Sequence, residues 1–192
     1  MKQRGFTLIE LLLGLIVSGI LAQLAVPGFK SLLDSQTRLS AAQTLASGLR
    51  YARTQAIARN RTVIIHALDD DWSRGWRVVV DMNGRGHLDD DNPVLLERQD
   101  NGRIPIVGNT PVRTQIRFSG LVEPLLSAGG FRAGTVHVCS TDQPLSLHQV
   151  VLAPTGRISL RSDKAEQALC RGYDELGLRA ANEPAAPWAW RK

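Results

Sequence analysis

The feature that most constrains this chain is an apolar run near its start, from Phe6 to Phe29. The run contains one charged residue, Glu10, and follows a short leader with Lys2 and Arg4. At a rise of about 1.5 Å per residue, roughly 20 such residues cross a hydrocarbon core of about 30 Å. We therefore expect residues 6–29 to span a membrane, with the leader on the cytoplasmic side because positive flanks resist translocation.

The run differs from an ordinary secretory signal peptide. Such peptides are cleaved after the apolar region, whereas this run reaches Pro27-Gly28 without a small-residue cleavage site. The possible processing point, Gly5-Phe6, precedes the run, so cleavage there leaves the helix on the mature protein. A carboxylate at Glu10 costs about 2.5–3.5 kcal/mol at the bilayer centre and less near the interface. We expect it to have a partner, the new α-amino group of Phe6 on the same chain or on a neighbour.

These residues carry a resemblance to a known family. The sequence Gly5-Phe6-Thr7-Leu8-Ile9-Glu10, followed by Leu11-Leu12, resembles the class III signal of type IV pilins and type II secretion pseudopilins. The resemblance implies that a prepilin peptidase cuts after Gly5 and methylates Phe6. It also implies that Glu10 helps to place the subunit in a growing filament and that Pro27 bends the helix.

Residues 30 to about 60 predict a continuation of the helix. Apolar residues recur there at three- and four-residue spacings and form one stripe: Leu39, Ala42, Ala46, Leu49, Ala52 and Ala56. The basic residues fall outside the stripe: Arg38, Arg50, Arg53, Arg59 and Arg61. The stripe should face a core, while the arginines should face solvent, an acidic partner or lipid headgroups.

After Asn60 the pattern changes to the short β-branched runs that are typical of strands. We expect strands at 62–67, 75–81, 94–98, 103–107, 115–118, 135–139, 149–152 and 157–161. Asp69-Asp70-Asp71 and Trp72 are expected in the turn between the first two strands, and Gly and Pro separate the later ones. One long helix followed by many short strands predicts an α+β fold with the helix packed on antiparallel sheet.

Three later segments resemble the GspH/FimT branch of the same family. They are Leu49–Ile57, the stretch from Trp72 to Gly86, and Pro154–Ile158. The resemblance reaches about Cys170 and implies a pilin-like fold with a leader at 1–5, a transmembrane half-helix at 6–29 and a periplasmic domain at 30–170. The tail, 171–192, has no strand pattern, and we expect it to be extended or mobile. Its Trp188 and Trp190 are available to dock on the domain or on a partner.

Cys139 and Cys170 are the only cysteines in the chain. The pilin-like signal places the domain outside the cytoplasm, where disulfides persist. The spacing of the two residues fits neither a C-x-x-C redox pair nor a metal site. We expect a Cys139–Cys170 disulfide, which should stabilise the fold by about 3 kcal/mol by closing a loop of about 30 residues.

The segment Asp81-Met82-Asn83-Gly84-Arg85-Gly86 matches the opening of a calcium loop, and Asp89-Asp90-Asp91 could supply further oxygens. However, Arg85 occupies a ligand position, and the twelfth residue is Asn92 where a calcium loop has a bidentate Glu. We interpret the segment as a Gly-rich turn between strands, with calcium binding as the alternative.

Nothing in the sequence indicates catalysis. The histidines are scattered without metal-ligand spacing, at His66, His87, His137 and His148. The G-x-S-x-G, P-loop and H-E-x-x-H motifs are absent from the sequence. We expect no enzyme activity, no catalytic residues, no cofactor and no metal site.

The best candidate for nucleic-acid binding is the basic segment with Arg157, Arg161 and Lys164. FimT-type minor pilins that bind DNA during natural transformation carry G-R-x-R near this place, whereas this chain reads Gly156-Arg157-Ile158-Ser159. Arg161 lies on the same face as Arg157 if the strand alternates regularly. The net charge of +5 is too mild to indicate a nucleic-acid partner by itself. We expect a structural turn and strand here, with weak DNA binding as the alternative.

The resemblance implies a minor pilin or pseudopilin that enters a filament, near its tip. The implied partners are a prepilin peptidase, other pilins or pseudopilins, and inner-membrane lipid. The implied location is the inner membrane of a Gram-negative bacterium, with the domain in the periplasm, before assembly. The shared signal serves both type IV pili and type II secretion systems, so both machines stay open. DNA uptake is the competing function.

Overall fold

The structure is a computed structural model, and it describes residues 7–87, 89, 91–120, 124–125 and 133–171, without the side chains of residues 22–28. The chain divides into two compact units at the junction of Arg38 and Leu39. One long helix, α1 (Leu8–Arg59), contributes to both units. It ends within one residue of the predicted limit.

The first unit consists of the beginning of α1. Its large apolar side chains are exposed, with Leu8 77% and Leu15 63% accessible. The helical backbone continues through Pro27, but the side chain of that residue lies outside the described ones, and the predicted bend stays a prediction. Within the described part of the chain, no helix is both long and apolar enough to cross a membrane.

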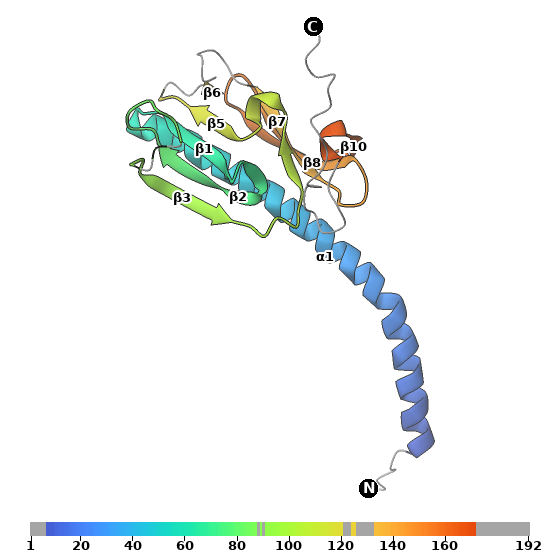
Figure 1. Ribbon diagram of the computed structural model, residues 1–192. Helices are drawn as coiled ribbons and strands as arrows, with labels where there is room; N and C mark the ends of the chain where they lie inside the picture. Colours follow the sequence, from blue (N-terminus) through green and yellow to red (C-terminus); the bar gives the residue numbers. More distant parts are fainter. Residues whose placement is uncertain (1–6, 88, 90, 121–123, 126–132, 172–192) are drawn as a thin grey trace. The chain divides into compact units, whose positions relative to one another are not determined.

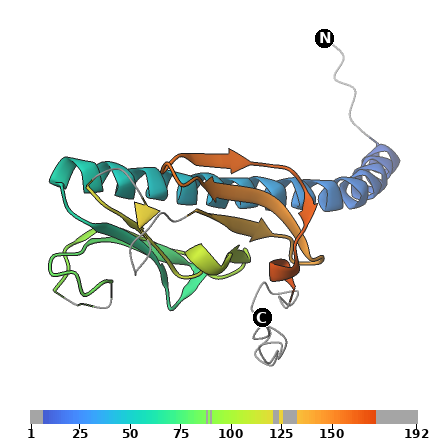
Figure 2. The ribbon, with the colours of Figure 1, turned by 90° about the horizontal axis from the view of Figure 1, so that it is seen from above.

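The second unit places the rest of α1 against two antiparallel sheets (Figure 2). The first sheet has the order β3 (Val94–Gln99), β2 (Asp71–Val80), β1 (Val63–Leu68), β5 (Gln115–Phe118) and β6 (Pro124–Leu125). The second has the order β10 (Ala165–Glu166), β8 (Leu145–Leu152), β7 (Gly134–Cys139) and β4 (Ile106–Gly108), with β9 (Ile158–Arg161) also paired to β8. Two short 3₁₀ helices, η1 (Thr110–Val112) and η2 (Ala168–Cys170), complete the described elements. The predicted α+β class is confirmed.

The predicted apolar stripe of α1 forms one wall of the core. Ala42, Ala46, Leu49, Ala52 and Ala56 are almost fully buried, together with Leu45, and they face apolar strand residues such as Val63, Ile65, Val78, Phe118 and Val136. Leu39, the first predicted member, is half-buried. Among the arginines outside the stripe, Arg50, Arg59 and Arg61 are exposed, whereas Arg53 is half-buried and its Nε atom is enclosed.

The helix α1 approaches the first sheet closely at Gly48. A Cβ atom at this position would lie 2.5 Å from the Cη2 atom of Trp76, which belongs to β2 and is 6% exposed. The absence of a side chain at Gly48 therefore allows the indole ring to pack directly against the helix backbone.

The hairpin between β1 and β2 is tighter than the sequence predicts. Its turn consists of Asp69 and Asp70 alone, with φ angles of 50° and 60°, and Leu68 pairs with Asp71 across it. Positive φ at both central residues is characteristic of a type I′ turn, which short polar side chains tolerate.

The prediction that Asp71 and Trp72 lie in this turn is wrong. Both residues belong to β2. Trp72 is 2% exposed, and its Nε1 atom donates to the carbonyl oxygens of Val112 at 3.1 Å and Arg113 at 2.8 Å. The indole of Trp72 is therefore part of the core and links β2 to η1. The start of β2 could not be located from the sequence because three consecutive aspartates favour a turn at any of them.

Candidate assembly and binding sites

The predicted processing point, Gly5-Phe6, lies outside the described residues. Glu10, the predicted assembly residue, is part of a capping box at the start of α1. The backbone N–H of Thr7 and its Oγ1 donate to Glu10 Oε2 at 2.9 and 2.8 Å, and the Glu10 N–H donates to Thr7 Oγ1 at 3.4 Å. Thr7 thus satisfies the carboxylate and also closes the first helical turn, since its carbonyl accepts from Leu11.

The interpretation of Glu10 from sequence missed Thr7 as a partner. A T-x-x-E pattern just before an apolar run is itself the sequence signature of a capping box. That signal was present in Thr7-Leu8-Ile9-Glu10. The α-amino group that cleavage would create belongs to Phe6, which the structure does not describe.

The Asp81 loop is built around a buried ion pair. Asp81 Oδ2 lies 2.7 Å from Arg117 Nη2, with side-chain exposures of 0% and 18%. Asp81 Oδ1 accepts from the backbone N–H groups of Gly84 at 2.8 Å and Gly86 at 3.4 Å. Both oxygens that a calcium loop would offer first are therefore already occupied by N–H donors and a guanidinium.

The other polar residues of the Asp81 loop also bond within it. Asn92 accepts from Met82 N–H and donates to the carbonyl of Gly86, and Asn83 donates to Asp89. No cluster of three metal-binding side chains occurs among the residues that the structure describes. This geometry favours the turn over the calcium loop, and Asp90 lies outside the described residues.

The Asp81 loop also brings two histidines together. The ring of His87 lies 4.6 Å, centre to centre, from that of His66 on β1. Burial lowers the pKa of His66 below its ordinary value, and the nearby His87 and Arg77 act in the same direction. Neutral His66 satisfies Nδ1 by a 3.1 Å hydrogen bond with the carbonyl of Ala67.

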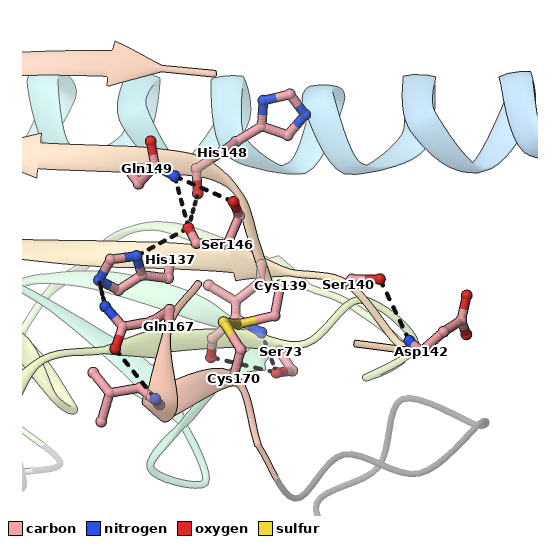
Figure 3. Close-up of a disulfide and its surroundings, with 12 residues drawn as sticks. Ser73, His137, Cys139, Ser140, Asp142, Ser146, His148, Gln149, Gln167 and Cys170 are labelled. Atoms are coloured by element: carbon pink, nitrogen blue, oxygen red, sulfur yellow. Dashed lines mark hydrogen bonds between the residues drawn. A yellow bond between two sulfur atoms is a disulfide. The ribbon is translucent and has the colours of Figure 1, made fainter. Parts of the chain in front are cut away.

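The predicted disulfide is confirmed. Cys139, at the end of β7, bonds to Cys170 in η2, with the Cα atoms 5.6 Å apart (Figure 3). Both cysteines are buried. The bond fixes the segment that follows β9 onto the second sheet.

A buried polar network lies beside the disulfide (Figure 3). It joins His137 on β7, Ser146 and Gln149 on β8, and Gln167 in the segment that ends at Cys170. His137, Ser146 and Gln149 are each less than 10% exposed, and burial lowers the pKa of His137. In the sequence His137 is one of four scattered histidines, and the network could not be predicted because its contacts join three segments that are distant in the sequence.

The predicted basic residues lie on the surface of the second sheet. The turn before β9 is closed by a 2.9 Å hydrogen bond from Gly156 N–H to the carbonyl of Ala153. In β9, Ile158 and Leu160 pack on the core, so Arg157, Ser159 and Arg161 lie on the opposite side.

Arg157 and Arg161 are exposed, and so is Lys164 beyond the strand. Neither of these arginines nor Lys164 forms an ion pair with another described residue. The helix adds a further cation beside them, since Arg50 Nη2 lies 3.5 Å from the carbonyl oxygen of Ile158. The arrangement can attract an anion.

Two protein-family models match this chain, one at its N-terminal segment and one over its domain. Residues 1–22 match the prokaryotic N-terminal methylation motif, and residues 41–156 match the family described as type II transport protein GspH. The pilin-like protein PilA1 of Thermus thermophilus is 38% identical over 92 residues, which are 46% of this chain. The match spans only about half of that relative, 55% of its length.

Among solved structures, the type IV minor pilin FimU of Pseudomonas aeruginosa aligns with a TM-score of 0.50 at 22% identity. The alignment covers 70% of this chain and 96% of that one. The likeness is one of fold, a helix packed on antiparallel sheet. Since the GspH model accounts for more than half of the 192 residues and follows an N-terminal methylation motif, this chain belongs to the GspH family of type IV pilin-like proteins.

Proposed function

We propose that this protein is a minor subunit of a type IV filament machine, cleaved by a prepilin peptidase between Gly5 and Phe6 and then assembled near the filament tip. The observation that carries the proposal is the order of two matches in one chain, a methylation motif at 1–22 followed by a GspH domain at 41–156. The first supports processing and filament entry, and the second supports a minor pilin or pseudopilin.

The first unit supports this proposal physically. Leu8, Leu15 and Ile16 are each more than half exposed, although burying a leucine contributes about 1.5–3 kcal/mol. In the proposal, inner-membrane lipid covers this apolar surface before assembly, and the helices of neighbouring subunits cover it in the filament. Residues 6–29 would form the anchor, with the leader in the cytoplasm and residues 30–170 in the periplasm.

The filament machine is either a type IV pilus or a type II secretion system. The matched family takes its name from type II transport, whereas a solved structure with this fold is a type IV minor pilin. Deletion of the gene, followed by a count of surface pili and an assay of secreted proteins, distinguishes them. Loss of pili alone supports a pilus subunit, and loss of secretion alone supports a pseudopilus subunit.

The test of filament entry uses Glu10→Val in the full chain. We expect normal membrane insertion and cleavage, with at least a severalfold lower amount in sheared filaments, because the carboxylate is needed in the assembled state. Quantitative mass spectrometry of membranes and filaments measures both fractions. Wild-type incorporation of this variant would count against the assembly role of Glu10.

A matched control separates assembly from helix capping. Thr7→Val removes the Oγ1 donor to Glu10 but keeps the carboxylate. Its effect should be limited to the cap, about 1 kcal/mol of local helix stability, so its incorporation should exceed that of Glu10→Val. Equal losses in the two variants would show that the capping box alone explains the effect.

A further inference from the structure

The segment 163–170, here called the strap, crosses the second sheet and is fastened to it at several points. Within it, β10 pairs Ala165 with Ser146 and Glu166 with Leu145. The N–H of Gln167 donates to the carbonyl of Pro144 at 2.9 Å. The strap ends at Cys170, which the disulfide joins to β7 (Figure 3).

Side chains under the strap hold it as well. Gln149 Nε2 donates to the carbonyl oxygen of Asp163 at 2.7 Å and to Ser146 Oγ at 2.8 Å. Gln167 Nε2 lies 3.2 Å from Nε2 of His137, whose Nδ1 lies 3.0 Å from Ser146 Oγ. Both ring nitrogens of His137 are therefore engaged, one by the strap and one by β8.

These contacts determine the protonation state of His137. Gln167 Oε1 accepts from the N–H of Leu169 at 3.2 Å, so its amide NH₂ group faces the imidazole. An amide NH₂ can only donate, so His137 Nε2 must accept and the ring proton lies on Nδ1. Nδ1–H donates to Ser146 Oγ, which in turn donates to the carbonyl of His148 at 3.3 Å. Of these hydrogen bonds, only the one from the Gln167 amide to Nε2 requires a neutral imidazole, since Nδ1–H can donate to Ser146 Oγ in either protonation state.

We propose that His137 is a proton-operated latch on the strap. Protonation of Nε2 places an N–H against the NH₂ group of Gln167, which turns the attraction into repulsion. The Cys139–Cys170 bond keeps the strap attached during this change. The strap therefore opens only after an external dithiol has reduced Cys139–Cys170 to two thiols and has itself been oxidised to a disulfide, so that opening requires both protonation of His137 and reduction of this bond.

Few ionisable groups oppose this mechanism. On β7, no titratable side chain other than His137 is present beside Cys139, and its neighbour on β4 is the apolar Val107. On β8, His148 contacts Ser162 Oγ. The strap itself carries three exposed charges, Asp163, Lys164 and Glu166. The pKa of His137 is lowered by burial alone, with no contribution from a neighbouring charge.

The direction of the pH effect follows from linkage. A free imidazole titrates near pH 6.5, and burial lowers the pKa of His137 below that value in the folded domain, where Gln167 of the strap lies against the ring. The opened state therefore binds more protons. Strap docking is at full strength above about pH 6.5 and weakens as the pH falls toward the folded pKa.

Opening the strap would change the surface around it. Leu169, in η2, is 42% exposed and forms part of the wall of a cavity of about 750 Å³. The other walls include Val107 of β4, Trp72 of β2 and Asp70 of the hairpin turn. Release of the strap removes one wall of this cavity and uncovers the edge of β8 that pairs with β10.

The test measures the pKa of His137 by NMR in the full chain held in detergent micelles. Oxidised wild type is compared with Cys139→Ser/Cys170→Ser, with His66 on the first sheet as an internal reference. We expect a pKa of His137 that is lower in the oxidised protein by about half a unit to one unit, because only the docked strap penalises the cation. Equal values would overturn the latch.

A second variant reverses the sign. Gln167→Glu places a carboxylate where the NH₂ group faces His137, so the pKa of His137 should rise above the wild-type value. The matched control is Gln143→Glu, which adds the same charge on an exposed residue of the β7–β8 turn and should change the pKa little. An unchanged or lower pKa in Gln167→Glu would contradict the proposed contact.

A third measurement needs no variant. Hydrogen exchange of the Gln167 and Cys170 amides is compared in oxidised and chemically reduced wild type at pH 7 and pH 5, after correction for intrinsic rates. Both amides bond within or beneath the strap. We expect a gain in exchange in the reduced protein at pH 5 that is at least tenfold larger than in the other three states. The same rates in all four states would refute the latch.

Discussion

The two regions of α1 have the same backbone and opposite surroundings. In Leu8–Arg38 the large apolar side chains that the structure describes are exposed, whereas in Leu39–Arg59 Leu45, Leu49 and Ala52 are almost fully buried. Figure 1 shows the second region of the helix lying along the sheets. From Leu8 to Phe29 the sequence of the first region has one charged residue, Glu10, whereas the second region has a single apolar stripe. The distribution of apolar residues in the second region therefore fits packing within its own domain. The distribution in the first region fits an apolar environment outside the domain.

Glycine illustrates this difference at single positions. A Cβ atom at Gly14 or Gly19 would meet nothing within 4 Å, but one at Gly48 would meet the ring of Trp76. Domain packing therefore does not require a glycine at position 14 or 19, but it does require one at position 48. Substitutions in the first region should therefore affect maturation and assembly, and those in the second should affect folding.

The largest effect is expected at the processing point. Changing Gly5 to Leu should block cleavage completely, since the peptidase of the implied family requires a small residue before Phe6. The precursor should stay in the membrane with a folded domain and an intact Cys139–Cys170 bond. Mass spectrometry of the N-terminal peptide measures cleavage, and normal mature protein from this variant would defeat the idea.

The next effect is smaller and lies in the second region. Replacing Gly48 with Ala should destabilise the domain by about 1–2 kcal/mol, because overpacking costs about 1–3 kcal/mol and the better helix propensity of Ala returns less than that. Chemical unfolding of the full chain, followed by Trp fluorescence, measures the loss.

The control for this prediction is the same substitution in the first region. Gly14→Ala meets no atom in the described chain, so the unfolding midpoint of the domain should not change. A loss at Gly14 equal to the loss at Gly48 would break the distinction between the two regions of α1.

Much of the fold could be predicted from local sequence signals. The apolar spacing of Ala42 to Ala56 placed the buried face of α1, and the run Gln115–Phe118 gave β5 with the right limits. The two cysteines gave the disulfide because no other pairing is possible within the chain. These predictions succeeded because each depends on periodicity or on counting.

The remainder depends on contacts between distant residues. The turn at Asp69-Asp70 was predicted to extend two residues too far, to Trp72, because three aspartates in a row leave the choice of turn residues to the sheet register. The role of Asp81 depends on Arg117, which is 36 residues away and reaches it only when β1 pairs with both β2 and β5. The network of His137 likewise exists only once β7, β8 and the strap are assembled.

The smallest expected effect concerns DNA binding. It tests whether the domain that contains the second region of α1 also binds nucleic acid. Arg157 and Arg161 share one exposed face of the second sheet, and over four strand residues that face is about 13 Å long. Such a length reaches about two phosphates, and the exposed Asp163 and Glu166 partly offset the charge. Binding should therefore be weak, without base specificity, and it should fall steeply with salt.

The test titrates duplex DNA at low salt into the full chain in detergent, beside Arg157→Gln/Arg161→Gln. We expect little binding in both proteins and only a small change on mutation. The matched control, Arg59→Gln/Arg61→Gln, removes the same charge from exposed residues at the end of α1. A micromolar affinity that only the Arg157/Arg161 variant abolishes would overturn this expectation. It would show that the domain has a nucleic-acid binding surface in addition to its core. DNA binding would then be a third function, beside assembly through the first region of α1 and domain packing through the second.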